Sequence, residues 1–106
     1  MGRDGFSGHL DLLLLASLRE RPMHGYALIE HVRQASGGHF DYPEGTIYPA
    51  LRRLEDQALV RSRWNDTDGR KRRVYALTSK GSRALEGQQA EWKRYIGSVQ
   101  AVVGHG

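Results

Sequence analysis

Apolar residues recur at helical spacing over residues 9–21, and they occupy two faces of the expected helix rather than one. Four of its leucines form one face, and Leu12 and Leu15 add a second. A helix that is apolar on two sides packs on its own core and also on another surface. Pro22 ends this helix because the residue before a proline avoids the α region.

Two further helices are expected downstream, one over residues 24–35 and one that begins near Gly45 or Thr46 and ends near residues 57–58. The later helix contains Pro49, and a proline in a helix interior costs about 3 kcal/mol. We therefore expect Pro49 in the first turn, where a backbone amide has no intrahelical partner and the fixed φ of proline favours initiation.

The apolar period changes to two after this helix. Residues 59–64 alternate as in a strand, residues 65–69 predict a turn with Asp68-Gly69 as its strongest signal, and residues 70–78 predict the returning strand. Trp64, on the first strand, is expected to pack at the base of this hairpin.

Thr78 or Ser79 is expected to cap a last helix that runs toward residue 103. A heptad-like series of apolar side chains follows this helix: Leu85, Trp92, Ile96, Val99 and Val103. Gln89 stands at a matching position, where a polar residue can fix the register of a coiled coil. The helix could fold back on its own core, but the preceding elements already form a closed unit, so we expect a dimer seam.

Charge is distributed unevenly. Residues 52–73 hold eight basic and four acidic residues, which accounts for the whole formal net charge of +4. A local positive surface binds polyanions because neutralising their phosphates releases counterions. A solvated basic loop is the alternative interpretation.

Three short helices, a basic hairpin and a long helix predict a fold that is mainly α with a small β-hairpin, namely a winged helix-turn-helix with a C-terminal dimerisation helix. We expect a flexible leader over residues 1–8, a winged helix-turn-helix DNA-binding domain over residues 9–78 and the dimerisation helix over residues 79–104. A chain of 106 residues suits one small domain, for which oligomerisation is a common source of stability.

Several classes of function are disfavoured by composition. The chain has no cysteine, which excludes thiol catalysis and disulfides. No apolar run approaches the roughly 20 residues of a membrane span, and no signal peptide is evident, so we expect a cytoplasmic protein with no membrane partner. No triad or phosphate-loop spacing is present, so we expect no enzyme. His24 and His31 could share a face, but we expect no metal and no cofactor, and interpret His24 as a helix-start residue.

A recognition helix would present the N-terminal half of the third helix to the major groove. Thr46 would cap this helix or donate to a phosphate, and Tyr48 offers a hydroxyl and a flat ring. Arg52 lies one turn beyond Tyr48 on the same side and can contact a phosphate or a guanine. Arg53 lies about 100° further round the helix, so we expect it to face solvent or acidic neighbours.

The hairpin tip suits a wing. Gly69 permits a tight turn, and strand alternation places Arg70 and Arg72 on one face and Lys71 and Arg73 on the other. One of these pairs is expected to address the minor groove or its flanking phosphates.

Four segments resemble the PadR family of bacterial transcriptional regulators, over roughly residues 9–103. They are LDLLLLASL (10–18), PMHGYAL (22–28), EGTIYPALRRLEDQALV (44–60) and GRKRRVYALTSKG (69–81), of which GTIYPAL and HGY are the most specific. The resemblance implies a repressor that binds palindromic operators through its third helix and wing, and that dimerises through its last helix with help from its first. Ala58 departs from the family pattern, where a glycine usually closes the recognition helix. Because alanine is strained in a left-handed position, we expect this helix end to differ locally.

We therefore expect a homodimeric, sequence-specific DNA-binding transcriptional regulator, a repressor released by an effector. The expected contacts to double-stranded DNA are Tyr26, Thr46, Tyr48, Arg52, Arg70, Lys71 and Arg72. The expected dimer contacts are Leu12, Leu15, Leu85, Trp92, Ile96, Val99 and Val103.

Some short members of this family bind flat hydrophobic drugs between tryptophans near the dimer centre. Trp92, with Leu12 and Leu15 as walls, is therefore a candidate site for a small hydrophobic or aromatic effector. An ordinary interface aromatic is the alternative interpretation of Trp92. For the whole chain, the alternative function is a winged-helix module for protein interaction or RNA binding without operator specificity.

Overall fold

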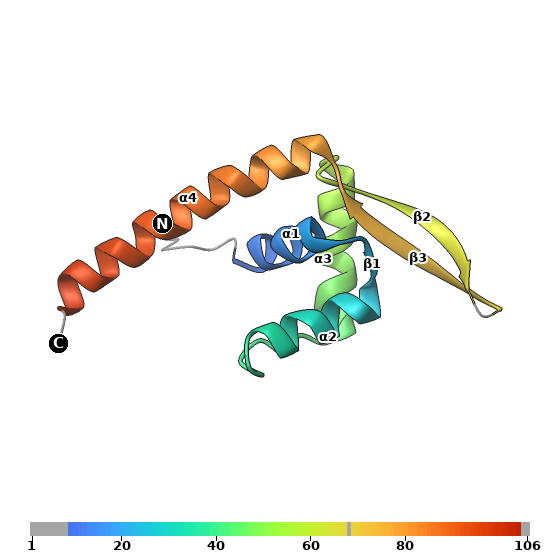
Figure 1. Cartoon of the computed structure of the whole chain (residues 1–106), viewed down its shortest axis with the longest axis horizontal. Helices are drawn as coiled ribbons and strands as arrows, with labels where there is room; N and C mark the ends of the chain where they lie inside the picture. The colour runs from blue at the N-terminus through green and yellow to red at the C-terminus, as the bar shows by residue number, and fades with distance from the viewer. Residues whose placement is uncertain (1–8, 68, 105–106) are drawn as a thin grey trace.

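The computed structural model describes residues 9–67 and 69–104; the leader expected over residues 1–8 lies outside them. The elements along the chain are α1 (His9–Glu20), β1 (Met23–His24), α2 (Gly25–Ala35), α3 (Glu44–Asp56), β2 (Val60–Thr67), β3 (Arg70–Leu77) and α4 (Ser79–Val103). Figure 1 shows α1, α2 and α3 grouped around one core, with the hairpin of β2 and β3 and the helix α4 extending from it. The expected fold, mainly α with a small hairpin, is confirmed.

The sheet has three antiparallel strands in the order β1-β3-β2. The short strand β1 was not expected; it pairs Met23 with Tyr75 and His24 with Val74. The hairpin turn is shorter than residues 65–69, because β2 continues to Thr67, which pairs with Arg70. Gly69 has φ +73°, a conformation that glycine adopts without strain. Asp68, the other half of the expected turn signal, lies outside the described residues.

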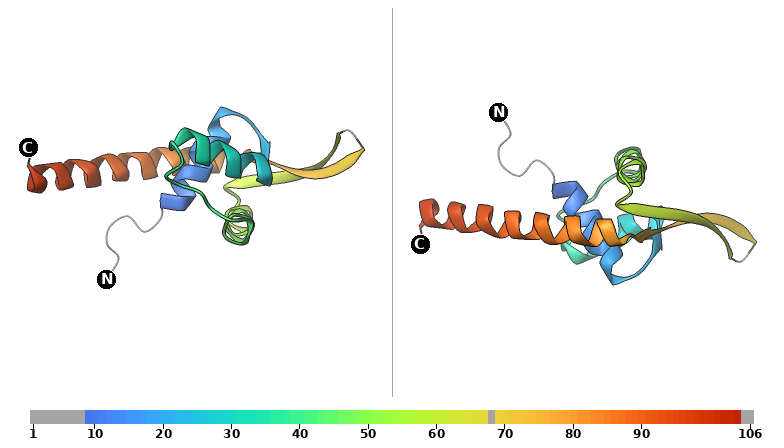
Figure 2. Two further views of the ribbon diagram at one scale, coloured as in Figure 1. Left: turned by 90° about the horizontal axis from the view of Figure 1, so that it is seen from below. Right: turned by 90° about the horizontal axis from the view of Figure 1, so that it is seen from above.

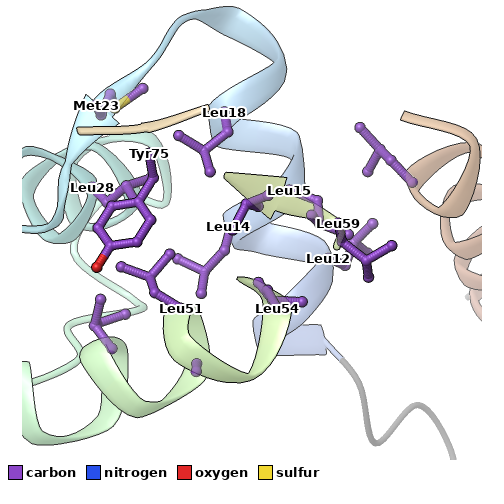
Figure 3. Packing of buried hydrophobic residues seen from close by; sticks show 14 of the residues in the cluster. Leu12, Leu14, Leu15, Leu18, Met23, Leu28, Leu51, Leu54, Leu59 and Tyr75 are labelled. Carbon is purple, nitrogen blue, oxygen red and sulfur yellow. The ribbon is translucent and has the colours of Figure 1, made fainter. Parts of the chain in front are cut away.

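The core is built from both apolar faces of α1, one face each of α2 and α3, and the inner face of the sheet (Figure 3). Its fully buried large side chains are Leu14, Leu15, Leu28, Ile47, Leu51, Leu54, Val60 and Leu85. From α4, only Gly81 and Leu85 are buried. A Cβ on Gly81 would lie 2.0 Å from the carbonyl oxygen of Leu59, so only glycine lets the start of α4 approach the α3–β2 junction this closely.

The second apolar face of α1 is not free in the single chain. Leu12 and Leu15 are 8% and 0% exposed and belong to the chain's own core, as does Leu85 of α4. Figure 3 shows Leu12, Leu15 and Leu59 on the side of the core toward α4. Because α4 of the same chain covers that face of α1, Leu12, Leu15 and Leu85 are already buried in the single chain, and their contact with a partner stays a prediction.

Pro49 lies deeper in α3 than expected. The helix begins at Glu44 after an N-cap at Pro43, so Pro49 is the sixth helical residue and not part of the first turn. Its missing N–H leaves the carbonyl of Gly45 without the usual i→i−4 bond. Gly45 and Pro49 are both exposed, so water can reach that carbonyl. Thr46 does not cap the helix either, because the N-cap is Pro43 and Thr46 is the third helical residue, whose N–H donates to the carbonyl of Pro43 at 3.0 Å.

The end of α3 keeps the geometry of a glycine-terminated helix although Ala58 stands there. Ala58 has φ +64°, and it is the one non-glycine residue of the described chain with positive φ. The N–H of Leu59 donates to the carbonyl of Leu54 and the N–H of Ala58 to that of Glu55, both at 2.9 Å, which is a Schellman motif. The expected local departure does not occur, and Ala58 carries the strain instead.

The last helix α4 begins with the expected cap and then leaves the body. The side chain of Thr78 accepts a hydrogen bond from the N–H of Gly81 at 2.9 Å and donates one to the carbonyl of Ala58 at 2.7 Å. Figure 2 shows α4 and the hairpin extending in opposite directions from the helical body, which makes the molecule 54 Å long. Within residues 9–67 and 69–104, no helix is long and apolar enough to cross a membrane.

Candidate nucleic-acid interface

The helix α3 divides cleanly into a core face and a solvent face. Its buried residues are Ile47, Ala50, Leu51 and Leu54. Thr46, Tyr48 and Arg52 lie on the exposed face, and Tyr48 is 40% exposed although its ring is aromatic. The side of α3 that was expected to face DNA is therefore the side that the fold leaves uncovered.

Tyr48 owes its position to a glycine on another helix. A Cβ on Gly25, the first residue of α2, would lie 2.5–2.6 Å from two ring carbons and the hydroxyl oxygen of Tyr48. The ring therefore lies across the bare backbone at the start of α2. This contact joins the HGY and GTIYPAL segments in space, and sequence reasoning did not find it.

A groove of about 430 Å³ runs between the start of α2, the solvent face of α3 and the strand β3. Its lining residues are His24, Tyr26, Tyr48, Arg70, Lys71, Arg72 and Arg73. Five of the seven expected DNA contacts thus line one groove, and the other two, Thr46 and Arg52, lie exposed on α3.

The four basic residues of β3 line this groove together, although alternation was expected to separate them into two faces. The strand β1 pairs with β3 only at Val74 and Tyr75. From Arg73 outward this edge of β3 is unpaired within the described sheet, so side chains from both faces reach the groove along it.

Arg73 is held at the root of the wing by the end of α3. Its Nε donates to Ser62 Oγ at 2.8 Å, and Ser62 Oγ lies 2.7 Å from Glu55 Oε2, to which it donates. The guanidinium also lies 5.1 Å from the ring centre of Trp64. Trp64 therefore packs on Arg73 at the wing root, as expected, although it stays 60% exposed.

Arg53 is turned away from the groove. Its guanidinium forms an ion pair and a hydrogen bond with Asp11 of α1, which confirms that Arg53 has an acidic neighbour. Two adjacent arginines on α3 therefore differ in their partners, since Arg52 faces solvent and Arg53 ties the helix to α1.

His24 connects the start of α2 to the wing. As expected of a helix-start residue, it is the N-cap of α2, and its Nδ1 accepts the N–H of Ala27 at 3.2 Å. Its other ring nitrogen, Nε2, lies 2.8 Å from Arg72 Nη1. Burial, and then the charge of Arg72, lower the pKa of His24 from its ordinary value, which favours the neutral ring.

The outer part of α4 exposes an apolar stripe. Its exposed members are Trp92, Tyr95, Val99, Val102 and Val103, and Ile96 is half-buried beside them. Tyr95 and Val102 were not among the expected seam residues, and the rings of Trp92 and Tyr95 lie 5.9 Å apart. Gln89 accepts a hydrogen bond from Arg19 of α1 at 3.2 Å, so its amide is used within the chain.

Comparison with known proteins agrees with this geometry. A model of the transcriptional regulator PadR-like family matches residues 14–87, which include α2, α3, the hairpin and the start of α4. The chain belongs to the PadR-like family of transcriptional regulators.

Solved PadR-family structures cover nearly the whole PadR-like chain. A PadR family transcription regulator from Clostridium difficile is 33% identical with a TM-score of 0.79, and the match covers 92% of this chain and all (100%) of that one. A PadR family regulator from Eggerthella lenta is 32% identical with a TM-score of 0.81, over 93% of this chain and 85% of that one.

The transcriptional regulator YqjI of Escherichia coli is 36% identical over 86 residues, which are 79% of this chain but 40% of YqjI. PadR-like regulators act on transcription through DNA and are not enzymes. The exposed face of α3 and the basic groove are accordingly the candidate nucleic-acid interface of this member.

Proposed function

We propose that this PadR-like chain is a homodimeric repressor that places α3 in the major groove and the wing against the adjacent minor groove of a pseudo-palindromic operator. The observation that carries the proposal is that Tyr48 lies both on the solvent face of α3 and in the groove lined by the basic strand β3. One surface thus presents Arg52 for base or phosphate contacts and Arg70 and Lys71 for the wing. A regulator of this kind acts in the cytoplasm, where the chromosome is.

The proposed dimer forms through α4. Its stripe of Trp92, Tyr95, Ile96, Val99 and Val103 lies outside the core, and a second copy of α4 would remove this apolar surface from water. For both copies of α3 to contact one operator, such a dimer would place them about 34 Å apart, one turn of DNA.

The proposed effector is a flat hydrophobic or aromatic molecule that stacks on Trp92. The ring is 37% exposed in the single chain and lies next to Tyr95, so two such pairs would meet near the dimer axis. Binding there would change the angle between the two winged units and hence their fit to the half-sites. A titration of tryptophan fluorescence with planar cationic and phenolic compounds measures this; no quenching by any of them would contradict it.

The DNA proposal is tested by comparing Arg52→Ala with Arg53→Ala in a gel-shift assay on a duplex selected by the wild-type chain. Both variants remove one positive charge from adjacent positions of α3, but only Arg52 faces the groove side, whereas Arg53 pairs with Asp11. We expect Arg52→Ala to weaken binding about 5- to 150-fold, from loss of a charged contact worth roughly 1–3 kcal/mol. We expect Arg53→Ala to stay close to wild type.

Equal losses in the two variants would show that net charge alone drives binding and would contradict the proposed interface. Equal affinity for a duplex RNA of the same sequence would favour an RNA-binding module instead.

A further inference from the structure

His24 faces a hydrogen-bond donor with each of its ring nitrogens. Nδ1 lies 3.2 Å from the backbone nitrogen of Ala27, and Nε2 lies 2.8 Å from Arg72 Nη1. A backbone N–H and a guanidinium can only donate. Both nitrogens of the imidazole would therefore have to accept for both contacts to be hydrogen bonds.

A neutral imidazole has one accepting nitrogen, and an imidazolium has none. The N–H of Ala27 is fixed by the first turn of α2 and cannot turn away, so Nδ1 is the acceptor and Nε2 carries the proton. The lowered pKa of His24 agrees with a neutral ring. Nε2–H and Arg72 Nη1 are then two donors 2.8 Å apart that cannot bond to one another, so an acceptor that bonds to both would stabilise their arrangement.

The surroundings select the kind of acceptor. The groove around His24 is lined by four basic side chains and two tyrosines, and among the described residues no carboxylate lines it. An oxyanion is the acceptor that such a groove attracts, and a DNA backbone phosphate carries two oxygens able to accept from separate donors.

We propose that His24 and Arg72 jointly bind one backbone phosphate of the duplex, with His24 as a neutral Nε2–H donor and Arg72 as the charged partner. The inference rests on the proposed DNA-binding function. It adds His24 to the interface as a binding residue and gives it two simultaneous roles, since Nδ1 caps α2 while Nε2 reaches the DNA. The phosphate thereby fixes the wing against the start of α2.

The test uses His24→Asn, because asparagine is a preferred N-cap that keeps the acceptor for Ala27 but is too short to replace Nε2. Affinity for a fluorescein-labelled duplex is measured by anisotropy across a range of salt, and thermal unfolding checks that the cap is kept. We expect His24→Asn to unfold near the wild-type temperature but to bind roughly tenfold more weakly, as for one lost hydrogen bond to a charged group.

Salt dependence separates the two partners. A neutral donor displaces no counterion, so His24→Asn should leave the slope of log K against log salt unchanged, whereas Arg72→Ala should reduce it by about one per phosphate contact. Because both residues bind one phosphate, the double variant should lose less affinity than the two single losses combined.

A second readout needs no variant. Long-range ¹H–¹⁵N NMR spectra of the imidazole should show the Nε2–H tautomer at neutral pH, and the Nε2–H signal should shift when duplex is added. Wild-type affinity in His24→Asn, or an Nδ1–H tautomer, would overturn the inference. If Arg52→Ala still loses binding in that case, the DNA-binding proposal stands. A wild-type chain that binds no duplex would overturn both.

Discussion

The strained alanine at the end of α3 gives a stability prediction whose sign and size follow from the backbone alone. Ala58 has φ +64°, a conformation that costs a non-glycine residue roughly 1–2 kcal/mol. Its side chain is exposed, so replacing it by glycine removes the strain and loses almost no buried surface. The Schellman hydrogen bonds use backbone atoms and are kept in Ala58→Gly.

The gain is reduced by the greater freedom of glycine in the unfolded chain, which costs about 0.4–1 kcal/mol. The net expectation for Ala58→Gly is a rise of about 0.5–1 kcal/mol in the free energy of unfolding. For a domain of this size that corresponds to an increase in Tm of about 3–6 °C.

The assay is thermal unfolding followed by circular dichroism, with all variants at one protein concentration because the Tm of the proposed dimer would depend on concentration. The matched control is Ala90→Gly, which makes the same change at an exposed position inside α4 and should lower stability by about 1 kcal/mol. An unchanged or lower Tm in Ala58→Gly would refute the reasoning from left-handed strain.

Three further outcomes are expected. Gly25→Ala should displace the Tyr48 ring, because the new methyl would lie 2.5 Å from it. The variant should therefore bind duplex about tenfold or more weakly. In a Tyr48→Ala background, Gly25→Ala should have no further effect in the gel shift. Val99→Glu should yield a folded monomer in sedimentation velocity, since Val99 is 39% exposed and outside the core; a dimer of unchanged affinity would contradict the seam. Folding lowers the pKa of His24 from its ordinary value of 6.5, so the unfolded state binds more protons. The contribution of His24 to the free energy of unfolding is therefore fully present above pH 6.5 and is lost as the pH falls through the folded pKa. His24→Asn should flatten this part of the Tm-against-pH profile, and an identical profile would argue against it.

Periodicity and local chemistry determined the order and type of the main elements. The three short helices, the hairpin and the long helix were all predictable because each has its own apolar repeat, and Thr78 and His24 were readable as helix-start residues. The exposed face of α3 followed for the same reason, since Ile47, Leu51 and Leu54 recur at core spacing and leave the opposite face to solvent.

Contacts between distant segments had no such signal. Three such contacts depend on how α1, α2, α3 and β3 pack. They join Gly25 to Tyr48, Asp11 to Arg53 and His24 to Arg72, and the two residues of each pair lie 23, 42 and 48 positions apart in the chain. The two-residue strand β1 is set by its pairing with β3 and is too short to show a period of its own.

The largest difference between the sequence-based prediction and the structure concerns which surface buries each apolar side chain. An apolar repeat indicates that its side chains are buried, but it does not indicate whether the surface that covers them belongs to the same chain or to a second copy. Leu12, Leu15 and Leu85 carry the same signal as Trp92 and Val99, yet the packing of α4 on α1 buries the first three within one chain and leaves the last two exposed. Sequence by itself determined that apolar faces exist and where they begin and end; the tertiary structure alone decided what covers each one, because burial depends on neighbours that are far away along the chain.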